Sequence, residues 1–213
     1  MHSYRSFLFF LVILITPLLH LRAQDQGTQI LEAARRKLLS LGDFTASFRY
    51  EITTPAAKPV VSTGEISYKQ GKYVLRLPDQ VVYCDLNTIW IYLTSESQVH
   101  ILPYSPANGP GIEGIVALYG GPGTVRYDGD AEWRGASFYK ISITIHDSYS
   151  EYSQAYLWIN KKTQMAERIT LVNRKQSTTT YEFSDVRTNN GIEDSAFRLE
   201  PSRLTGVNVM DRR

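Results

Sequence analysis

The spacing of apolar residues changes from a helical period to a period of two near residue 43. Over residues 24–42 the apolar side chains fall on one side of a helix, which predicts an amphipathic helix there. Gly42 suits the position just after its C-terminal end. The apolar stripe consists of Ile30, Ala34, Leu38 and Leu41, with Leu31 and Leu39 widening it.

From residue 44 onward, strict alternation of apolar and polar residues predicts a half-buried strand. Its apolar positions are Phe44, Ala46, Phe48, Tyr50 and Ile52. We expect Pro55 and Pro59 to end this strand in a loop. Further short strands are predicted at 66–69, 73–77, 81–84, 89–93 and 99–102. Two of these, 81–84 and 89–93, are apolar on both faces, so something besides the first helix must cover the sheet.

The second half of the chain also consists mainly of strand patterns. Residues 103–114 are rich in proline and glycine and predict a loop, and a short helix is expected at 112–119. Strands are predicted at 138–146, 155–160, 165–173 and 178–186, and Phe197, Leu199, Val207 and Val209 are expected to finish the sheet. The pattern as a whole predicts an α+β protein with one large antiparallel sheet.

The first 23 residues have the pattern of a secretory signal peptide. Arg5 precedes an apolar segment at 7–19, and Ala23 lies at the expected cleavage site. We therefore expect a signal peptide over 1–23 and one domain over 24–213, with an uncleaved N-terminal anchor as the alternative. Cleavage removes two arginines and no acidic residue, which leaves 21 basic and 21 acidic residues. A neutral chain of this kind does not favour nucleic acid or an anionic membrane as the main partner.

The residues after 23 show no pattern that points to catalysis or metal binding. His100 and His146 lie on separate predicted strands, and there is no G-x-S-x-G motif. The segment Asp128-Gly-Asp130 lacks the remaining ligands of a calcium loop and is interpreted as a polar turn. Cys84 lies among apolar residues and is expected to act as a small core side chain. The sequence therefore predicts no enzyme, no metal and no cofactor.

Aromatic residues make up 12% of the chain and include 14 tyrosines. Most of them are expected in the core or in cross-strand pairs. Some can instead line a concave face that binds acyl chains without fixed hydrogen bonds.

The order of several motifs resembles that of the periplasmic outer-membrane lipoprotein carriers, the LolA family. The motifs are LGDFTASFRYEI after the helix, then GEISYKQGKYVLRL, then CDLNTIWIYLTSESQVHI, and finally YEFSDVRTNNGIEDSAFRLEPSRLTGVNVMD. Two positions depart from the family pattern. Leu86 replaces a turn glycine, so the turn is expected to differ, and Gln70 replaces an arginine that holds the lid closed in better-known members.

The resemblance implies a single incomplete, strongly curved antiparallel β-barrel with helices covering its concave face. It also implies a non-enzymatic, monomeric periplasmic carrier that takes acylated lipoproteins from an inner-membrane ABC-type releasing complex toward the outer membrane, where an acceptor is possible. The first helix and the 112–119 helix would form the lid. The alternative is a periplasmic lipid- or protein-binding sensor or scaffold on the same fold. The residues expected to line the acyl-chain cavity are Phe48, Tyr50, Ile66, Tyr68, Leu75, Leu77, Trp90, Tyr92 and Leu118.

Overall fold

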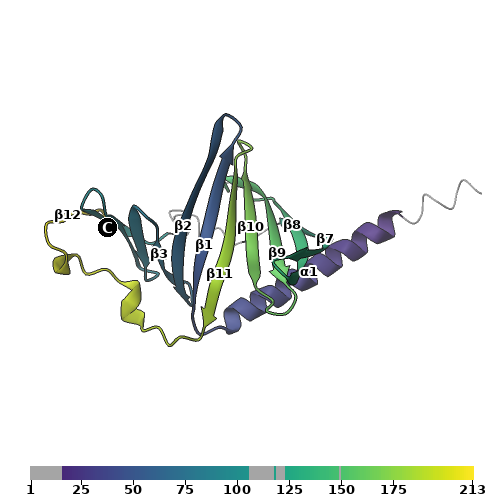
Figure 1. Ribbon diagram of the computed structural model, residues 1–213, viewed down its shortest axis with the longest axis horizontal. Helices are drawn as coiled ribbons and strands as arrows, with labels where there is room; N and C mark the ends of the chain where they lie inside the picture. Colours follow the sequence, from purple (N-terminus) through teal and green to yellow (C-terminus); the bar gives the residue numbers. More distant parts are fainter. Residues whose placement is uncertain (1–15, 106–117, 119–122, 149) are drawn as a thin grey trace, which may run out of the picture.

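The computed structural model describes residues 16–105, 118, 123–148 and 150–213, with side chains described from Gln26 onward. Within these residues, one long α-helix, α1 (Thr16–Ser40), precedes twelve strands that form a single open sheet (Figure 1). The strands are β1 (Phe44–Thr54), β2 (Ala57–Lys69), β3 (Lys72–Arg76), β4 (Gln80–Cys84), β5 (Thr88–Leu93), β6 (Gln98–Pro103), β7 (Gly123–Trp133), β8 (Ala136–Ile145), β9 (Tyr152–Asn160), β10 (Ala166–Asn173), β11 (Thr178–Thr188) and β12 (Asn208–Asp211).

The strand order is β12-β6-β5-β4-β3-β2-β1-β11-β10-β9-β8-β7. All neighbouring strands pair antiparallel except β12, which lies parallel to β6. The prediction of one large antiparallel sheet preceded by a helix is therefore confirmed. The predicted helix at 112–119 lies outside the described residues apart from Leu118.

The helix α1 begins earlier than the apolar stripe predicted, and it packs on β7 and β8. Leu31 and Ala34 of the predicted stripe are buried, whereas Leu39 is exposed. At Gly27 the helix backbone approaches β7 closely, because an added Cβ atom would lie 2.7 Å from the backbone nitrogen of Tyr127. Among the described residues, no helix is both long enough and apolar enough to cross a membrane.

The prediction that Pro55 ends the first strand is confirmed, because β1 ends at Thr54 and Pro55 lies in the turn that follows. The prediction that Pro59 also belongs to this loop is wrong, because β1 and β2 form one long hairpin and Pro59 lies inside β2. Proline is tolerated there for two reasons. This part of β2 pairs only with β1, since its pairing with β3 begins at Glu65. In addition, the ladder with β1 is irregular opposite Pro59, between Ile52 and Thr54.

The interpretation of Asp128-Gly-Asp130 as a turn is also wrong. These residues lie inside β7, a strand that the sequence pattern did not indicate. The β7–β8 ladder shifts register between Tyr127 and Gly129, and Gly129 has a φ of 106°. A bulge with glycine in this conformation interrupts the alternation of apolar and polar residues, which explains why the strand pattern was missed.

The chain after β11 does not finish the sheet in the way that the sequence predicted. Residues 189–207, here called the strap, include two short 3-10 helices, η1 (Asp194–Phe197) and η2 (Pro201–Arg203), and only β12 after them joins the sheet. The strap runs from the end of β11, near the middle of the sheet, to the far edge beside β6 (Figure 1). It therefore lies across the β3–β6 half of the sheet.

Polar contacts attach the strap to three strand ends. The carboxylate of Asp43 accepts hydrogen bonds from the backbone N–H groups of Asn190 and Ile192, at 2.6 and 2.8 Å. Asp194 forms ion pairs with both lysines of the β2–β3 hairpin, Lys69 and Lys72. Further along, Arg198 donates a 2.7 Å hydrogen bond to Asp85.

Apolar residues of the strap cover a small core on the same side of the sheet. Trp90, Val99 and Ile101 are buried there, and Leu199, Leu204 and Val207 pack against them. Phe197 of η1 is fully buried. This finding accounts for the strands 81–84 and 89–93 being apolar on both faces, because the strap covers one face of that half. We call this side of the sheet the strap face and the side that carries α1 the helix face.

Loss of the Asp85 carboxylate is expected to destabilise the protein. Asp85 is buried, and it accepts hydrogen bonds from the backbone N–H groups of Asn87 and Thr88 as well as from Arg198. Asp85→Ala leaves these donors without their acceptor, which costs about 1–3 kcal/mol of unfolding free energy. Urea denaturation measures the change, with the exposed Asp79→Ala as the matched control. Equal effects of the two substitutions would contradict this role of Asp85.

The attachment of the strap is also expected to weaken in acid. Hydrogen bonds from Lys72 and Lys69 lower the pKa of Asp194 from 3.8 to about 2. Because the pKa is lower in the folded state, the stabilisation is complete above about pH 4 and is lost as the pH falls toward 2. The difference in urea midpoint between wild type and Asp194→Asn should therefore be largest near neutral pH and disappear near pH 2. A difference that does not change with pH would count against the ion pairs.

Candidate functional site

The helix face of the sheet carries one apolar surface that crosses both halves of the sheet. Two clusters of buried residues make up this surface. One spans β1–β5, and the other spans β8–β10 together with α1. Tyr181 and Phe183 of β11 pack against both clusters. The two halves therefore join at the centre of the sheet without a polar boundary.

Strand register shows which residues belong to this surface. Ala46 of β1 lies opposite Ile66 of β2, which lies opposite Leu75 of β3. Directly opposed residues point to the same face of a sheet, and alternate residues along a strand share that face. Six of the residues that the sequence analysis expected in the cavity therefore lie together on the helix face: Phe48, Tyr50, Ile66, Tyr68, Leu75 and Leu77.

The structure places Trp90 and Tyr92 on the strap face, so their assignment to the same surface as Phe48 is wrong. In β5, Ile89 lies opposite Cys84, which itself lies opposite Tyr73 on the helix face. Trp90 is offset from Ile89 by one residue and so points to the other side, where the strap covers it. Every residue of 89–93 is apolar, so the sequence did not distinguish the two faces.

The sequence analysis also missed several residues of the helix face. They are Tyr73, Val82, Ile89, Ile91, Ile169, Leu171, Tyr181 and Phe183. Following the pairing from Ala46 across each hairpin would have found those of β3–β5, because antiparallel partners share a face. The residues of β10 and β11 depended on knowing that β11 pairs with β1, a contact that joins distant parts of the chain.

Aromatic rings meet at the centre of the helix face. The ring centroid of Phe48 lies 6.0 Å from that of Tyr181 and 5.9 Å from that of Phe183. Burial raises the pKa of Tyr181 to about 12, so its hydroxyl stays neutral at physiological pH. A surface of rings and aliphatic side chains can bind apolar groups without fixed hydrogen bonds.

Two segments cover parts of the helix face. The helix α1 lies against β7 and β8, and its residues Leu31 and Ala34 belong to the cluster of that half. The chain between Pro103 of β6 and Gly123 of β7 connects opposite ends of the strand order. Two described residues of this connection contact the helix face, Tyr104 in the β1–β5 half and Leu118 beside α1. Through these two residues the chain contacts both halves of the apolar surface.

Both departures from the family pattern lie in hairpin turns. Gln70 and Gly71 form the β2–β3 turn with φ angles of 49° and 91°. Leu86 in the β4–β5 turn has a φ of 72°, in the left-handed region that favours glycine. The turn therefore does not have to change its backbone conformation to accommodate a leucine, because Leu86 itself takes a conformation that glycine usually adopts.

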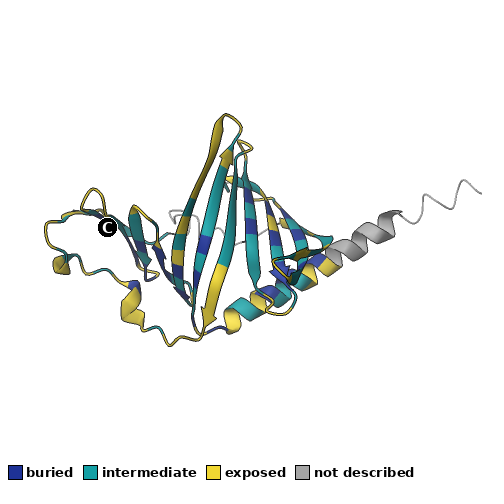
Figure 2. Ribbon diagram, in the orientation of Figure 1, coloured by how far each residue is buried: buried dark blue, intermediate teal, exposed yellow. Residues whose placement is uncertain are grey.

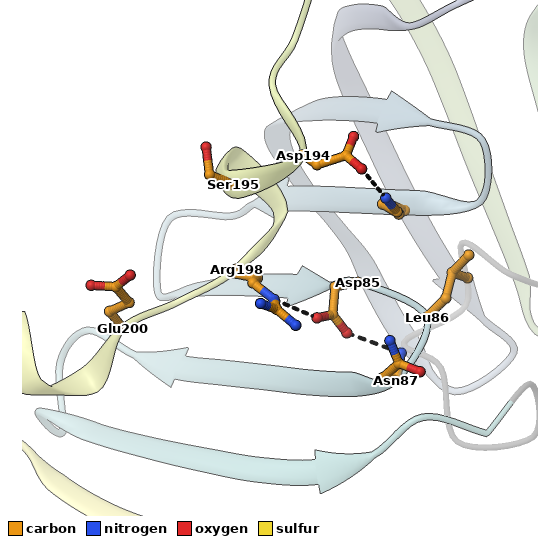
Figure 3. Close-up of a pocket in the computed structure, with 8 residues that line it drawn as sticks. Asp85, Leu86, Asn87, Asp194, Ser195, Arg198 and Glu200 are labelled. Atoms are coloured by element: carbon orange, nitrogen blue, oxygen red, sulfur yellow. Dashed lines mark hydrogen bonds and ion pairs between the residues drawn. The ribbon is translucent and has the colours of Figure 1, made fainter.

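A polar pocket of about 600 Å³ lies between these turns and the strap (Figure 3). Its charged residues are already paired, Lys72 with Asp194 and Arg198 with Asp85 (Figure 3). The pocket is lined by Lys72, Asp85, Leu86, Asn87, Asp194, Ser195, Arg198 and Glu200. Across the part of the chain that the structure describes, no group of three or more His, Cys, Asp or Glu side chains is arranged to hold a metal ion. We therefore take the helix face, and not this pocket, as the candidate functional site.

The body of the sheet and the segments at its margins also differ in burial. Figure 2 shows buried positions across the body of the sheet, whereas much of the strap and the end of the β1–β2 hairpin are exposed. Phe48 and Ile66 are each only 4% exposed in this conformation. A ligand on the helix face would therefore have to displace some of its cover.

The close contact at Gly27 provides a test of how firmly α1 is held on the sheet. In an isolated helix, glycine to alanine stabilises by about 1 kcal/mol. In this protein Gly27→Ala should instead weaken α1 packing, because the new Cβ would clash with the backbone of Arg126 and Tyr127 in β7. Hydrogen–deuterium exchange should then increase in α1 and β7. Gln29→Ala, at an exposed position of the same helix, should leave exchange unchanged. A Gly27→Ala protein with unchanged or slower exchange would show that the close contact does not hold α1.

Solved structures of other proteins resemble this fold. An uncharacterized conserved protein from Thermus thermophilus superimposes with a TM-score of 0.61 at 11% identity, covering 88% of this chain and 99% of that one. The lipoprotein LppX of Mycobacterium tuberculosis gives a TM-score of 0.51 at 13% identity, covering 79% and 98%. Both likenesses show a shared fold. A comparison with curated proteins gave no match.

The family comparison agrees with the motif order found in the sequence. The model of the outer membrane lipoprotein carrier protein LolA matches residues 76–200, from the end of β3 into the strap. This match spans more than half of the chain. It includes strands from both halves of the helix face as well as residues 189–200 of the strap. The chain therefore belongs to the LolA family of outer membrane lipoprotein carrier proteins.

Proposed function

We propose that this protein is a non-enzymatic carrier that binds the acyl chains of lipoproteins on its helix face and moves them between membranes. The observation that supports this most directly is the unbroken apolar surface, joined across the sheet by Tyr181 and Phe183. A surface of that extent can hold long acyl chains, and it recognises them by shape and apolarity rather than by specific hydrogen bonds.

The energetics of acyl binding require a cover that can move. Burying an acyl chain is worth about 0.8 kcal/mol per CH₂ group, so ten methylenes contribute about 8 kcal/mol. Because the helix-face residues are already buried, part of this gain is offset by displacing what covers them. The balance between the two lets a carrier bind firmly and still release its cargo.

In this proposal the cover over the concave side of an incomplete barrel includes α1 and, from the β6–β7 connection, Tyr104 and Leu118. The contacts of Leu31, Ala34 and Leu118 within one cluster support this assignment. With Gln70 in place of the family's arginine, close packing at Gly27 takes over the task of holding the lid. The proposed acyl-chain lining consists of Phe48, Tyr50, Ile66, Tyr68, Leu75, Leu77 and Leu118.

The proposal includes a route for the cargo. The protein works in the periplasm as a monomer after removal of its signal peptide, and it receives lipoproteins from an inner-membrane ABC-type releasing complex. It then delivers them to the outer membrane, directly or through an acceptor protein. Membership of the LolA family supports this route.

Site-specific photocrosslinking tests which face binds the acyl chains. Tyr50 and Tyr92 are both half-buried tyrosines of the same sheet, and they lie on opposite faces. Each is replaced in turn by benzoylphenylalanine, and the protein is incubated with a triacylated lipopeptide and irradiated. We expect a lipopeptide adduct from position 50 and little or none from position 92. Equal adducts from the two positions, or an adduct from position 92 alone, would refute the assignment to the helix face.

Native mass spectrometry of protein purified from the cell envelope tests the cargo itself. A carrier should retain triacylated lipoprotein, and addition of the purified protein to inner-membrane vesicles should release lipoprotein from them. A lipid-free protein that also fails to release lipoprotein would rule out the carrier function.

A further inference from the structure

The strap leaves the β7–β10 half of its face uncovered, and two tryptophans lie there. The centroids of Trp133 in β7 and Trp158 in β9 are 6.1 Å apart. Both rings lie against Phe138, at 5.8 and 6.2 Å, and Phe138 is fully buried. The two indoles themselves remain partly exposed. On the other half of the same face, the strap covers the comparable tryptophan, Trp90.

Two arginines stack on these indoles. The guanidinium carbon of Arg134 lies 4.1 Å from the ring centroid of Trp133, and that of Arg168 lies 5.2 Å from the centroid of Trp158. A guanidinium over an indole face is favourable, and the stacking also fixes the direction in which the charge is presented. We call Trp133, Arg134, Trp158 and Arg168 the tryptophan–arginine patch.

One carboxylate forms ion pairs with both arginines and is less exposed than they are. Glu182 of β11 accepts a 2.8 Å hydrogen bond from Arg134 and lies 3.7 Å from the Nε atom of Arg168. Its side chain is only 15% exposed, compared with 55% for Arg134 and 34% for Arg168. The groups that face solvent are therefore guanidiniums and indoles, and the complementary surface is one with carboxylates around an apolar centre.

The composition of the patch indicates that its binding partner is a protein and not a lipid surface. Tryptophan and arginine are the residues most enriched among those that dominate the energetics of protein interfaces. Guanidinium groups bind carboxylates with two parallel hydrogen bonds. Binding to anionic lipid, in contrast, depends on clusters of about 4–8 basic residues. Here Lys140 adds one charge by its register opposite Trp158, and the carboxylate of Glu182 offsets another.

We propose that the tryptophan–arginine patch docks this protein on an acidic surface of the membrane protein that supplies its lipoprotein cargo. The inference rests on the proposed carrier function and names its loading surface. Because the patch lies on the strap face, the helix face stays free to receive the acyl chains during docking.

Flotation with vesicles tests the docking. Fluorescently labelled protein is mixed with inner-membrane vesicles of the host cell, or with protein-free liposomes made from the lipids of those vesicles. We expect wild type to bind the vesicles, in a manner weakened by salt, and not the liposomes. Arg134→Glu with Arg168→Glu should lower the apparent affinity for vesicles about tenfold or more. The neutral pair Arg134→Gln and Arg168→Gln, which avoids repulsion of Glu182, should give a smaller loss in the same direction.

Matched controls separate docking from folding and from cargo binding. Lys58→Glu with Lys175→Glu makes the same change in net charge at two exposed hairpin positions outside the patch, and should bind vesicles like wild type. The urea midpoint and the lipopeptide adduct at position 50 should be retained in all variants. Normal vesicle binding by the folded patch variants, or equal binding of wild type to protein-free liposomes, would overturn the proposal. Loss of the adduct at position 50 in wild type would instead overturn the carrier function.

Discussion

The close approach of β1 to β2 at Phe48 is the contact on which the centre of the molecule depends. Phe48 lies opposite Gly64, and its ring occupies the space that a side chain at residue 64 would need, because an added Cβ atom would lie 2.5 Å from the Phe48 Cζ atom. Only glycine leaves that space free. The ring can then contact Tyr181 and Phe183 of β11, which connect the two apolar clusters. Together with the contact between Tyr50 and Tyr181, this contact joins the two apolar clusters into one surface.

The two faces of the sheet are covered in different ways, and this difference is the basis of the proposed function. The strap is attached to the strap face by Asp43, Asp85 and Asp194, through hydrogen bonds and ion pairs that are short and directional. Leu31, Ala34 and Leu118 of the cover contact the helix face through apolar side chains. Apolar contacts are not directional, so an acyl chain can replace them with contacts of the same kind. The strap is therefore suited to act as a fixed part of the scaffold. The cover of the helix face is suited to act as a lid.

The half of the strap face that lies beyond the strap gives the molecule a third surface with a different chemistry. Its stacked indoles and guanidiniums are held by cross-strand neighbours, so the surface is already in place before a partner binds. Cargo binding and partner docking can thus use opposite sides of one sheet. Such a division lets the protein stay bound to its partner while the lid opens.

The sequence by itself determined most of the elements and the family. The helical stripe at Ile30, Ala34 and Leu38, the alternation from Phe44 to Ile52 and the motif order were sufficient, because these patterns are local along the chain. Only the tertiary structure decided that Trp90 faces the strap, that β7 continues through a bulge at Gly129, and that the chain after β11 crosses the sheet. A period of two shows that a strand has two faces, but the pairing of distant strands decides which face meets the helix.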